Sequence, residues 1–230
     1  MNLTKITQEE YEHLEEQKVV SPSKESSAIN KLMNIYKRWE EKNTAFFEDE
    51  LFVDIPYLSA RKMLQKNLFY TSQDITVFSS QLVQSLKEDE SIKIGVFVSA
   101  LINNHYAKTK QKEAYIVITE DSDLKDVQFL CYKNNGATVH IEGDCWSDLC
   151  SHMKKGKITI TGNAGYCAGT SMKGGTLTAF SALSGLGQFM QGGTIYITGD
   201  CEKFSHLTSI THEGGNIIYL GKKIQKKDLT

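Results

Sequence analysis

The chain has 230 residues, and its 26 basic and 28 acidic side chains give a formal net charge of −2. This balance disfavours nucleic acid or an anionic membrane surface as the main partner. No apolar run approaches the roughly 18 residues of a membrane-spanning helix, and residues 1–30 are too polar for a secretory signal.

The five cysteines are an odd number and show no CxxC spacing. Unpaired thiols of this kind are typical of a reducing compartment. Together with the missing signal and membrane segments, they predict a cytoplasmic protein. Secretion without a cleavable signal is the alternative that the sequence leaves open.

Glycine divides the chain sharply near residue 113. Of the 17 glycines, only Gly95 precedes Gly136, and the second half is also rich in Thr, Ile and Val. The sequence therefore predicts an α+β protein with a polar, acidic segment and linker at 1–27, a helical domain at 28–112 and a β-rich domain at 113–230.

Apolar residues recur at helical spacing throughout the first half. Asp54 and Pro56 form a plausible helix start. We interpret the apolar residues as ordinary core, and no motif here points to chemistry. The predicted helices contain Ala28, Leu32, Met33, Tyr36 and Trp39; Leu58, Met63 and Leu64; Ile75, Phe78, Leu82, Val83 and Leu86; and Val96–Ile102.

A repeat of about nineteen residues fills the second half, with one strand signal in each unit. Short strands flanked by glycine cannot form helical units, so stacked rungs of a parallel β-helix are predicted, about five to six of them. Ile116 and Ile118 fit an earlier rung, and Val127–Tyr132 fits a further strand. The five clear copies are 137–143, 156–162, 175–181, 193–199 and 215–221.

Alternation within each strand sends two residues per unit inward, where stacking builds an apolar column. Met153, Met172 and Met190 form a second column, each three residues before the next unit. The predicted inward pairs are Val139/Ile141, Ile158/Ile160, Leu177/Ala179, Ile195/Ile197 and Ile217/Tyr219.

Glycines mark the corners of the predicted rungs, where the backbone turns sharply. Asp144, Asn163 and Asp200 share one corner position, and short polar side chains there are expected to accept hydrogen bonds from turn amides. The repeat glycines are Gly143, Gly156, Gly162, Gly165, Gly169, Gly175, Gly187, Gly193, Gly199, Gly215 and Gly221.

One unit, Gly162-Asn-Ala-Gly165-Tyr-Cys-Ala-Gly169, resembles the GXGXG repeat. This repeat forms the C-terminal β-helix of the glutamate synthase large subunit and recurs in one of the subunits of formylmethanofuran dehydrogenase. The resemblance covers about residues 134–221, although Ser181 and Ser184 depart from its glycines. It implies a right-handed parallel β-helix with a structural and docking role. Nothing here resembles the amidotransferase, flavin-binding or pterin-binding parts of those enzymes, so no catalytic residue is carried over.

Cys145 and His152 are the candidates for a thiol-dependent or metal-dependent enzyme. However, Cys145 and Cys201 take the same repeat position as Ala164 and Leu183. A position that accepts Cys, Ala and Leu is typical of stacked apolar packing. Structural roles are therefore favoured, and no cofactor or metal is expected.

The outward strand positions include an apolar set in adjacent rungs, and a contiguous exposed patch of this kind calls for an explanation. Either the helices of the same chain cover it, or it docks another protein or a second copy. Unpaired end rungs also need capping, for which the helical half and residues 222–228 are available. The candidate binding residues are Phe180, Tyr196, Ile218 and Leu220.

The sequence thus favours a non-catalytic scaffold or protein–protein interaction protein, with no nucleic-acid or membrane partner. Two alternatives remain. One is an accessory subunit of a larger redox or amidotransferase assembly, as in the families it resembles. The other is the thiol or metal enzyme above, and fold analogy does not decide among them.

Overall fold

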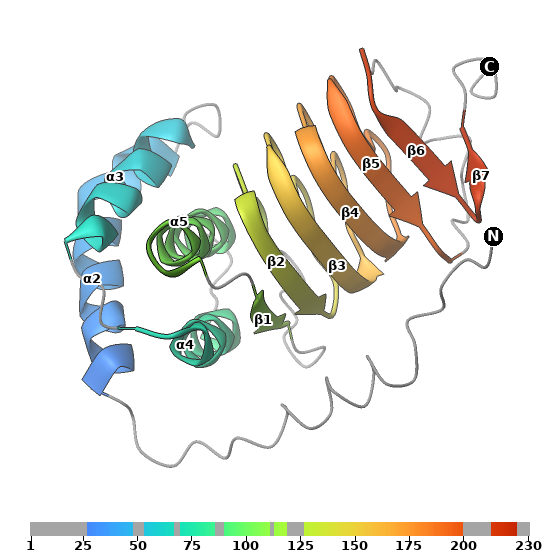
Figure 1. Cartoon of the computed structure of the whole chain (residues 1–230). Coiled ribbons are helices and arrows are strands. Elements are labelled where there is room, and N and C mark those ends of the chain that lie inside the picture. The colour runs from blue at the N-terminus through green and yellow to red at the C-terminus, as the bar shows by residue number, and fades with distance from the viewer. Residues whose placement is uncertain are drawn as a thin grey trace.

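The computed structural model describes residues 27–47, 53–66, 70–85, 90–110, 113–118, 127–199 and 213–224. Within these residues, four α-helices and a short 3-10 helix lie at one end of a parallel β-solenoid (Figure 1). The predicted order of helices followed by a β-solenoid is confirmed. The elements are α2 (Ser27–Asn43), η1 (Thr44–Phe47), α3 (Asp54–Gln65), α4 (Ser72–Gln84), α5 (Ser91–Thr109), β1 (Glu113–Val117), β2 (Asn135–Glu142), β3 (Lys155–Asn163), β4 (Lys173–Ser181), β5 (Gly192–Ile197), β6 (Asn216–Tyr219) and β7 (Lys222–Lys223).

The helices follow their apolar spacing. In α2, Leu32, Tyr36 and Trp39 are buried, as the periodicity predicts. Helix α4 begins at a capping box: the Thr71 hydroxyl accepts a hydrogen bond from the Asp74 N–H, and the Asp74 carboxylate accepts one from the Thr71 N–H. Capping of both amides stabilises this helix start.

The prediction that Leu58 of α3 belongs to the core is wrong. Leu58 is 60% exposed, whereas Tyr57, Ala60 and Leu64 are buried. The buried residues are three and four positions apart and form the face that packs on α5. Leu58 lies off that face, so its hydrophobicity alone predicted its burial incorrectly. The predicted helix position Leu86 lies outside the described residues.

Strands β1 to β6 pair in parallel in chain order. The predicted inward column is buried from Val139 to Ile217, and Tyr219 is partly buried at the last rung. Met153, Met172 and Met190 are fully buried. Both predicted columns thus form the solenoid core, which is continuous with the core of the helices.

The solenoid has about four turns rather than the predicted five to six. The prediction counted every strand as a full turn, but a turn also needs a return wall opposite the strand. That wall is described continuously only from Val127 to the start of β5, because residues 119–126 and 200–212 lie outside the described residues.

The return wall consists of tight turns in which every second residue has a left-handed backbone. The φ angles of these positions lie between 52° and 80°. Only three of the positions hold glycine, which adopts this conformation without steric cost. They are Phe129, Cys131 and Lys133; Asp148, Cys150 and His152; Cys167, Gly169 and Ser171; and Gly185, Gly187 and Phe189.

The segment Val127–Tyr132 belongs to this wall and is not the predicted strand. It makes a single isolated bridge, between Gln128 and Ser147. The left-handed residues Phe129 and Cys131 interrupt the extended backbone that a strand requires. The segment still hydrogen-bonds to the next rung, because the Cys150 N–H donates to the Leu130 carbonyl at 2.9 Å.

The corner of the third unit is one residue shorter than the repeat pattern predicts. Ser181 pairs with Asn163, not with the strand-ending Gly162. The Ala164 N–H donates a hydrogen bond to the Ser181 carbonyl. As a result Ala182, and not Leu183, takes the buried position in this rung. The small-apolar packing position therefore exists, shifted by one residue.

The predicted turn-capping role of the corner side chains is confirmed where it is described. Asp144 Oδ1 accepts a hydrogen bond from the Asn163 N–H at 2.7 Å, and Asn163 Oδ1 accepts one from the Gly165 N–H at 2.7 Å. Asp200 lies outside the described residues.

Helix α5 covers the first rung with a stripe of small and polar residues spaced by four. Ser91 Oγ accepts from Gln128 Nε2 at 3.3 Å, and Ser99 Oγ accepts from the Tyr132 N–H at 3.0 Å. Asn103 donates to the Tyr132 carbonyl at 3.1 Å. The helix therefore supplies the hydrogen bonds that a preceding rung would otherwise make.

The other end of the sheet is closed by β7, which pairs antiparallel with β6 (Figure 1). It consists of two exposed lysines, Lys222 and Lys223. A short, charged edge strand discourages pairing with another chain.

Candidate functional site

The candidate binding residues lie on the outer side of the last described strands. Phe180 is 54% exposed and Leu220 is 50% exposed, whereas Tyr196 and Ile218 are partly buried. Tyr196 and Ile218 are register partners in β5 and β6. Leu220 follows β6 in a turn with φ of 44°, so it lies beyond the strand position that the repeat assigned to it.

Thr198, which is itself exposed, lies between Phe180 and Leu220, the two most exposed of the candidate binding residues. The Gly199 N–H donates to the Phe180 carbonyl, and the Leu220 N–H donates to the Ile197 carbonyl. These bonds order Phe180, Thr198 and Leu220 along the outer side of successive rungs. With Tyr196 and Ile218 they form one surface, which we call the outer apolar face.

The described helices lie at the opposite end of the sheet. Helix α4 packs on β1 and α5 packs on β2, whereas the outer apolar face belongs to β4, β5 and β6 (Figure 1). The helices therefore cap the first rung and do not lie over this face.

Cys145 lies inside the solenoid with two further thiols. It is 4% exposed, and Cys131 and Cys150 are even more deeply buried. Burial raises the pKa of Cys145 well above its ordinary value, and the neighbouring Cys131 and Asp144 raise it further. Because the thiolate is the reactive form, Cys145 has the character of a core residue.

His152 faces a different set of groups. Its ring meets the edge of Tyr132, with 5.6 Å between ring centroids. Burial lowers the pKa of His152, Lys133 and Lys173 lower it further, and Asp54 opposes them. Among the described residues no hydrogen bond joins His152 to Cys145, so the structure does not bring this candidate pair together.

No metal-binding group is formed by the part of the chain that the structure describes: nowhere in it do three His, Cys, Asp or Glu side chains gather in a suitable arrangement.

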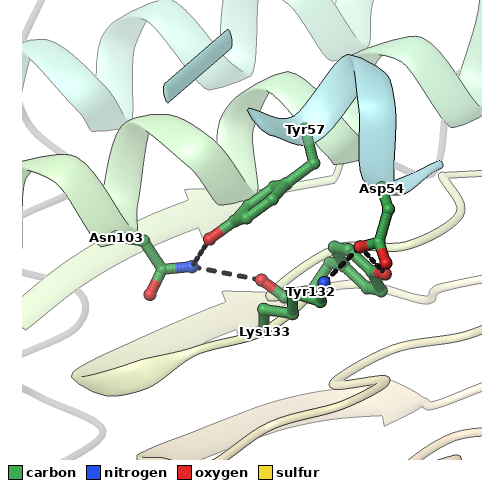
Figure 2. Close-up of polar contacts among 5 residues, drawn as sticks. All are labelled: Asp54, Tyr57, Asn103, Tyr132 and Lys133. Carbon is green, nitrogen blue, oxygen red and sulfur yellow. Dashed lines mark hydrogen bonds and ion pairs between the residues drawn. The ribbon is translucent and has the colours of Figure 1, made fainter. Parts of the chain in front are cut away.

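A polar cluster joins α3 and α5 to the first turn of the solenoid (Figure 2). Asp54 accepts hydrogen bonds from the Tyr132 hydroxyl, at 2.6 Å, and from the Lys133 ammonium group. Asn103 Nδ2 donates to the Tyr57 hydroxyl at 3.0 Å and also to the Tyr132 carbonyl. The cluster thus fastens the helical cap to the solenoid.

The acid–base properties of this cluster suit a structural role. Burial raises the pKa of Tyr132 far above its ordinary value, and its hydrogen bond to Asp54 raises it further. Tyr57 also has a raised pKa, mainly through burial. Both phenols therefore stay protonated at neutral pH and act as fixed hydrogen-bond partners rather than as bases.

Replacing Asp54 with Asn should make stability less dependent on pH. Burial raises the pKa of Asp54, but hydrogen bonds from Lys133 and Tyr132 outweigh it, so the net pKa is lowered. A lowered carboxyl pKa stabilises the fold above the unfolded-state pKa, and this contribution is lost as pH falls through the folded-state value. Asp54→Asn should therefore cost up to about 1 kcal/mol at pH 7, a small effect because the pair is solvent-exposed.

Urea unfolding at pH 7 and near pH 3 checks this expectation, since the difference from the native protein should be smaller in acid. Glu213→Gln, which removes an exposed carboxylate at the other end of the solenoid, is the control. An Asp54→Asn difference that is equal at both pH values would contradict the proposed role of the ion pair.

Sequence reasoning missed this cluster because its members come from separate segments of the chain. The stripe of Ser91, Gly95, Ser99 and Asn103 in α5 was the available signal. Its spacing of four residues, inside an otherwise apolar helix, points to one face with special packing.

None of the helices in the described ranges is both long and apolar enough to cross a membrane. Comparisons with known proteins give no relative: no family model, no curated protein and no solved structure matches this chain.

Proposed function

We propose that this protein is a non-catalytic scaffold that binds another protein, or a second copy of itself, through the outer apolar face. The observation that carries the proposal is the position of Phe180 and Leu220. Each is at least half exposed on the outside of the solenoid, on the rungs either side of Thr198, at the end of the sheet away from the helical cap. Exposed apolar residues grouped on a rigid surface are typical of protein-docking sites.

We also propose that this protein is related to the right-handed GXGXG β-helices, and the backbone conformation of the return wall supports this. Left-handed residues recur at every second position of the return wall, which is the spacing of glycines in a G-x-G-x-G pattern. At most of these positions this chain has other residues, such as Cys150 and Ser171. A weak sequence pattern on this backbone is what a diverged member would show, and a docking role fits such a domain.

The alternative thiol enzyme receives less support. Cys145 is buried with a raised pKa, and it lies among other thiols rather than beside His152. No observation on the described residues favours the accessory-subunit alternative over a free-standing scaffold. The free thiols Cys131, Cys145, Cys150 and Cys167 support the proposed cytoplasmic location, since a reducing compartment keeps thiols unpaired.

Substituting Phe180 with Asp should abolish partner capture while preserving the fold. A buried carboxylate at the centre of an apolar interface is strongly unfavourable, so affinity should fall at least about 30-fold. The exposed position of Phe180 predicts a small effect on folding. The measurement is affinity capture with the full-length chain from its own source, with identification of the partner and titration of the purified pair.

Leu58→Asp is the matched control, because Leu58 is 60% exposed on α3 in the helical cap. It should retain partner binding. Sedimentation of the purified chain tests the self-association form of the proposal in the same variants. If neither a partner nor self-association responds to Phe180→Asp, the outer apolar face is not the docking site.

A further inference from the structure

Four exposed lysines gather where the solenoid strands begin. They lie at the start of β3 and β4, on two successive rungs, and the return-wall residues Lys133 and His152 lie nearby. We call the four lysines the basic strip: Lys154, Lys155, Lys157 and Lys173.

The register of the solenoid places two of these lysines directly beside each other. The Lys173 N–H donates to the Met153 carbonyl at 2.8 Å, which makes Lys173 the neighbour of Lys154 in the next rung. Neighbouring rungs are about 4.8 Å apart, and like charges at that separation repel each other. This concentration of positive charge therefore lowers the stability of the folded protein rather than raising it.

No described carboxylate neutralises the strip. None of its four lysines forms an ion pair or a side-chain hydrogen bond with another described residue. In the strand register Asn135 pairs with Lys155 and Gly192 pairs with Lys173, so both of these neighbours are uncharged. Gln191, which precedes Gly192, donates a hydrogen bond to Glu213.

His152 lies close to two positive charges, those of Lys133 and Lys173. After burial, the charges of Lys133 and Lys173 are the groups that lower its pKa, and the nearby Asp54 only partly opposes them. Asp54 is itself paired with Lys133. The acidic group that reaches this region from the described part of the helical cap is therefore already engaged.

We propose that the basic strip is a second docking surface, which binds a polypeptide segment rich in glutamate and aspartate. Carboxylates that alternate along an extended chain recur about every 7 Å on one side, a spacing that reaches lysines on neighbouring rungs. Three of the lysines lie where β3 and β4 begin, whereas Phe180 lies near the end of β4 and Leu220 follows β6, so the two proposals are tested by different substitutions.

The residue types favour an acidic polypeptide over a nucleic acid. Nucleic-acid surfaces typically combine lysine with arginine and with exposed aromatic rings on which bases stack. The strip contains only lysine, and the two arginines of the whole chain, Arg38 and Arg61, lie in the helical part.

The test is fluorescence anisotropy with a labelled synthetic peptide of about ten residues, mostly glutamate, and the full-length protein. Binding should weaken at least about tenfold in Lys154→Glu/Lys173→Glu, because the variant replaces attraction with repulsion. It should also weaken as ionic strength rises from about 0.02 M to 0.15 M, where the screening length falls to about 8 Å.

Three controls make the result decisive. Lys222→Glu/Lys223→Glu has the same change in net charge at the far end of the sheet and should bind within about twofold of the native protein. A peptide with glutamine in place of glutamate should not bind. The native-like circular dichroism of both variants establishes that they are folded.

Four outcomes would overturn the proposal: no binding of the acidic peptide, equal binding of the glutamine peptide, equal losses in the two double variants, or tighter binding of a single-stranded oligonucleotide of matched charge. The last outcome would identify the strip as a nucleic-acid surface instead.

Discussion

Replacing Gly95 with Ala should lower the free energy of unfolding by about 2–3 kcal/mol, although alanine is the better helix former by about 1 kcal/mol. Gly95 lies within α5, where the helix crosses the first rung of the solenoid. A Cβ atom at this position would lie 1.8 Å from the Gln128 carbonyl oxygen and 2.9 Å from its carbon. Both are backbone atoms, so the helix itself must move away.

Such a movement would also weaken the polar contacts of the cap. Ser99 and Asn103 bind the backbone of Tyr132 one and two helical turns further along the same face. Their bonds depend on the close approach that Gly95 permits. Urea unfolding of the variant measures the total loss.

Ala107→Gly is the matched control, because Ala107 is an exposed position in the same helix. It should cost about 1 kcal/mol, the ordinary difference in helix propensity. The Gly95→Ala loss should exceed it even though the change in propensity has the opposite sign. A Gly95→Ala protein that is as stable as the native chain would contradict the close packing of α5 on the rung.

The second large effect is expected at Gly156, at the start of β3. Its φ is +105°, a conformation that side chains rarely adopt, and an added Cβ would lie 2.2 Å from the Ala137 carbonyl oxygen. Backbone strain and overlap with the neighbouring rung should together cost about 3–4 kcal/mol in Gly156→Ala. Urea unfolding, read out by circular dichroism, is the measurement.

Gly187→Ala separates strain from overlap. Gly187 has φ of 65°, and an added Cβ would meet only the flexible ends of Ile217, Ile195 and Met190, at 3.0 Å or more. The equivalent positions of earlier rungs hold Cys131 and Cys150 in the same conformation. Its cost should therefore be about 1 kcal/mol. Equal losses at Gly156 and Gly187 would show that overlap with the neighbouring rung is not the dominant effect.

The sequence alone determined the architecture of the solenoid core. Inward residues such as Val139 and Ile158 alternate with outward ones, and the unit length repeats, so strand identity and stacking order follow from a pattern with a period of two. The buried methionines and the helix start at Asp54 were also predictable. In each case the signal is local, repeated or both.

The return wall was beyond such reasoning. Its alternating left-handed residues include Phe129, Cys150 and Ser171, none of which indicates a positive φ by its type. The hydrogen bonds to adjacent rungs impose that conformation, and this explains why the predicted strand at Val127–Tyr132 was wrong. The one-residue shortening that places Ala182 in the core is likewise a property of the stacked register.

Some features of the candidate sites could be predicted from the sequence, and others could not. Alternation placed Phe180 outside, and the repeat position of Cys145 indicated packing before chemistry; both follow from the sequence. Only the tertiary structure decided that the helices cap the first rung, that Asp54 meets Tyr132 and Lys133, and that Lys154 adjoins Lys173. The physical reason is that these contacts join residues 19 or more positions apart, which come together only when helices dock and rungs stack, whereas the alternation of a strand is written in consecutive residues.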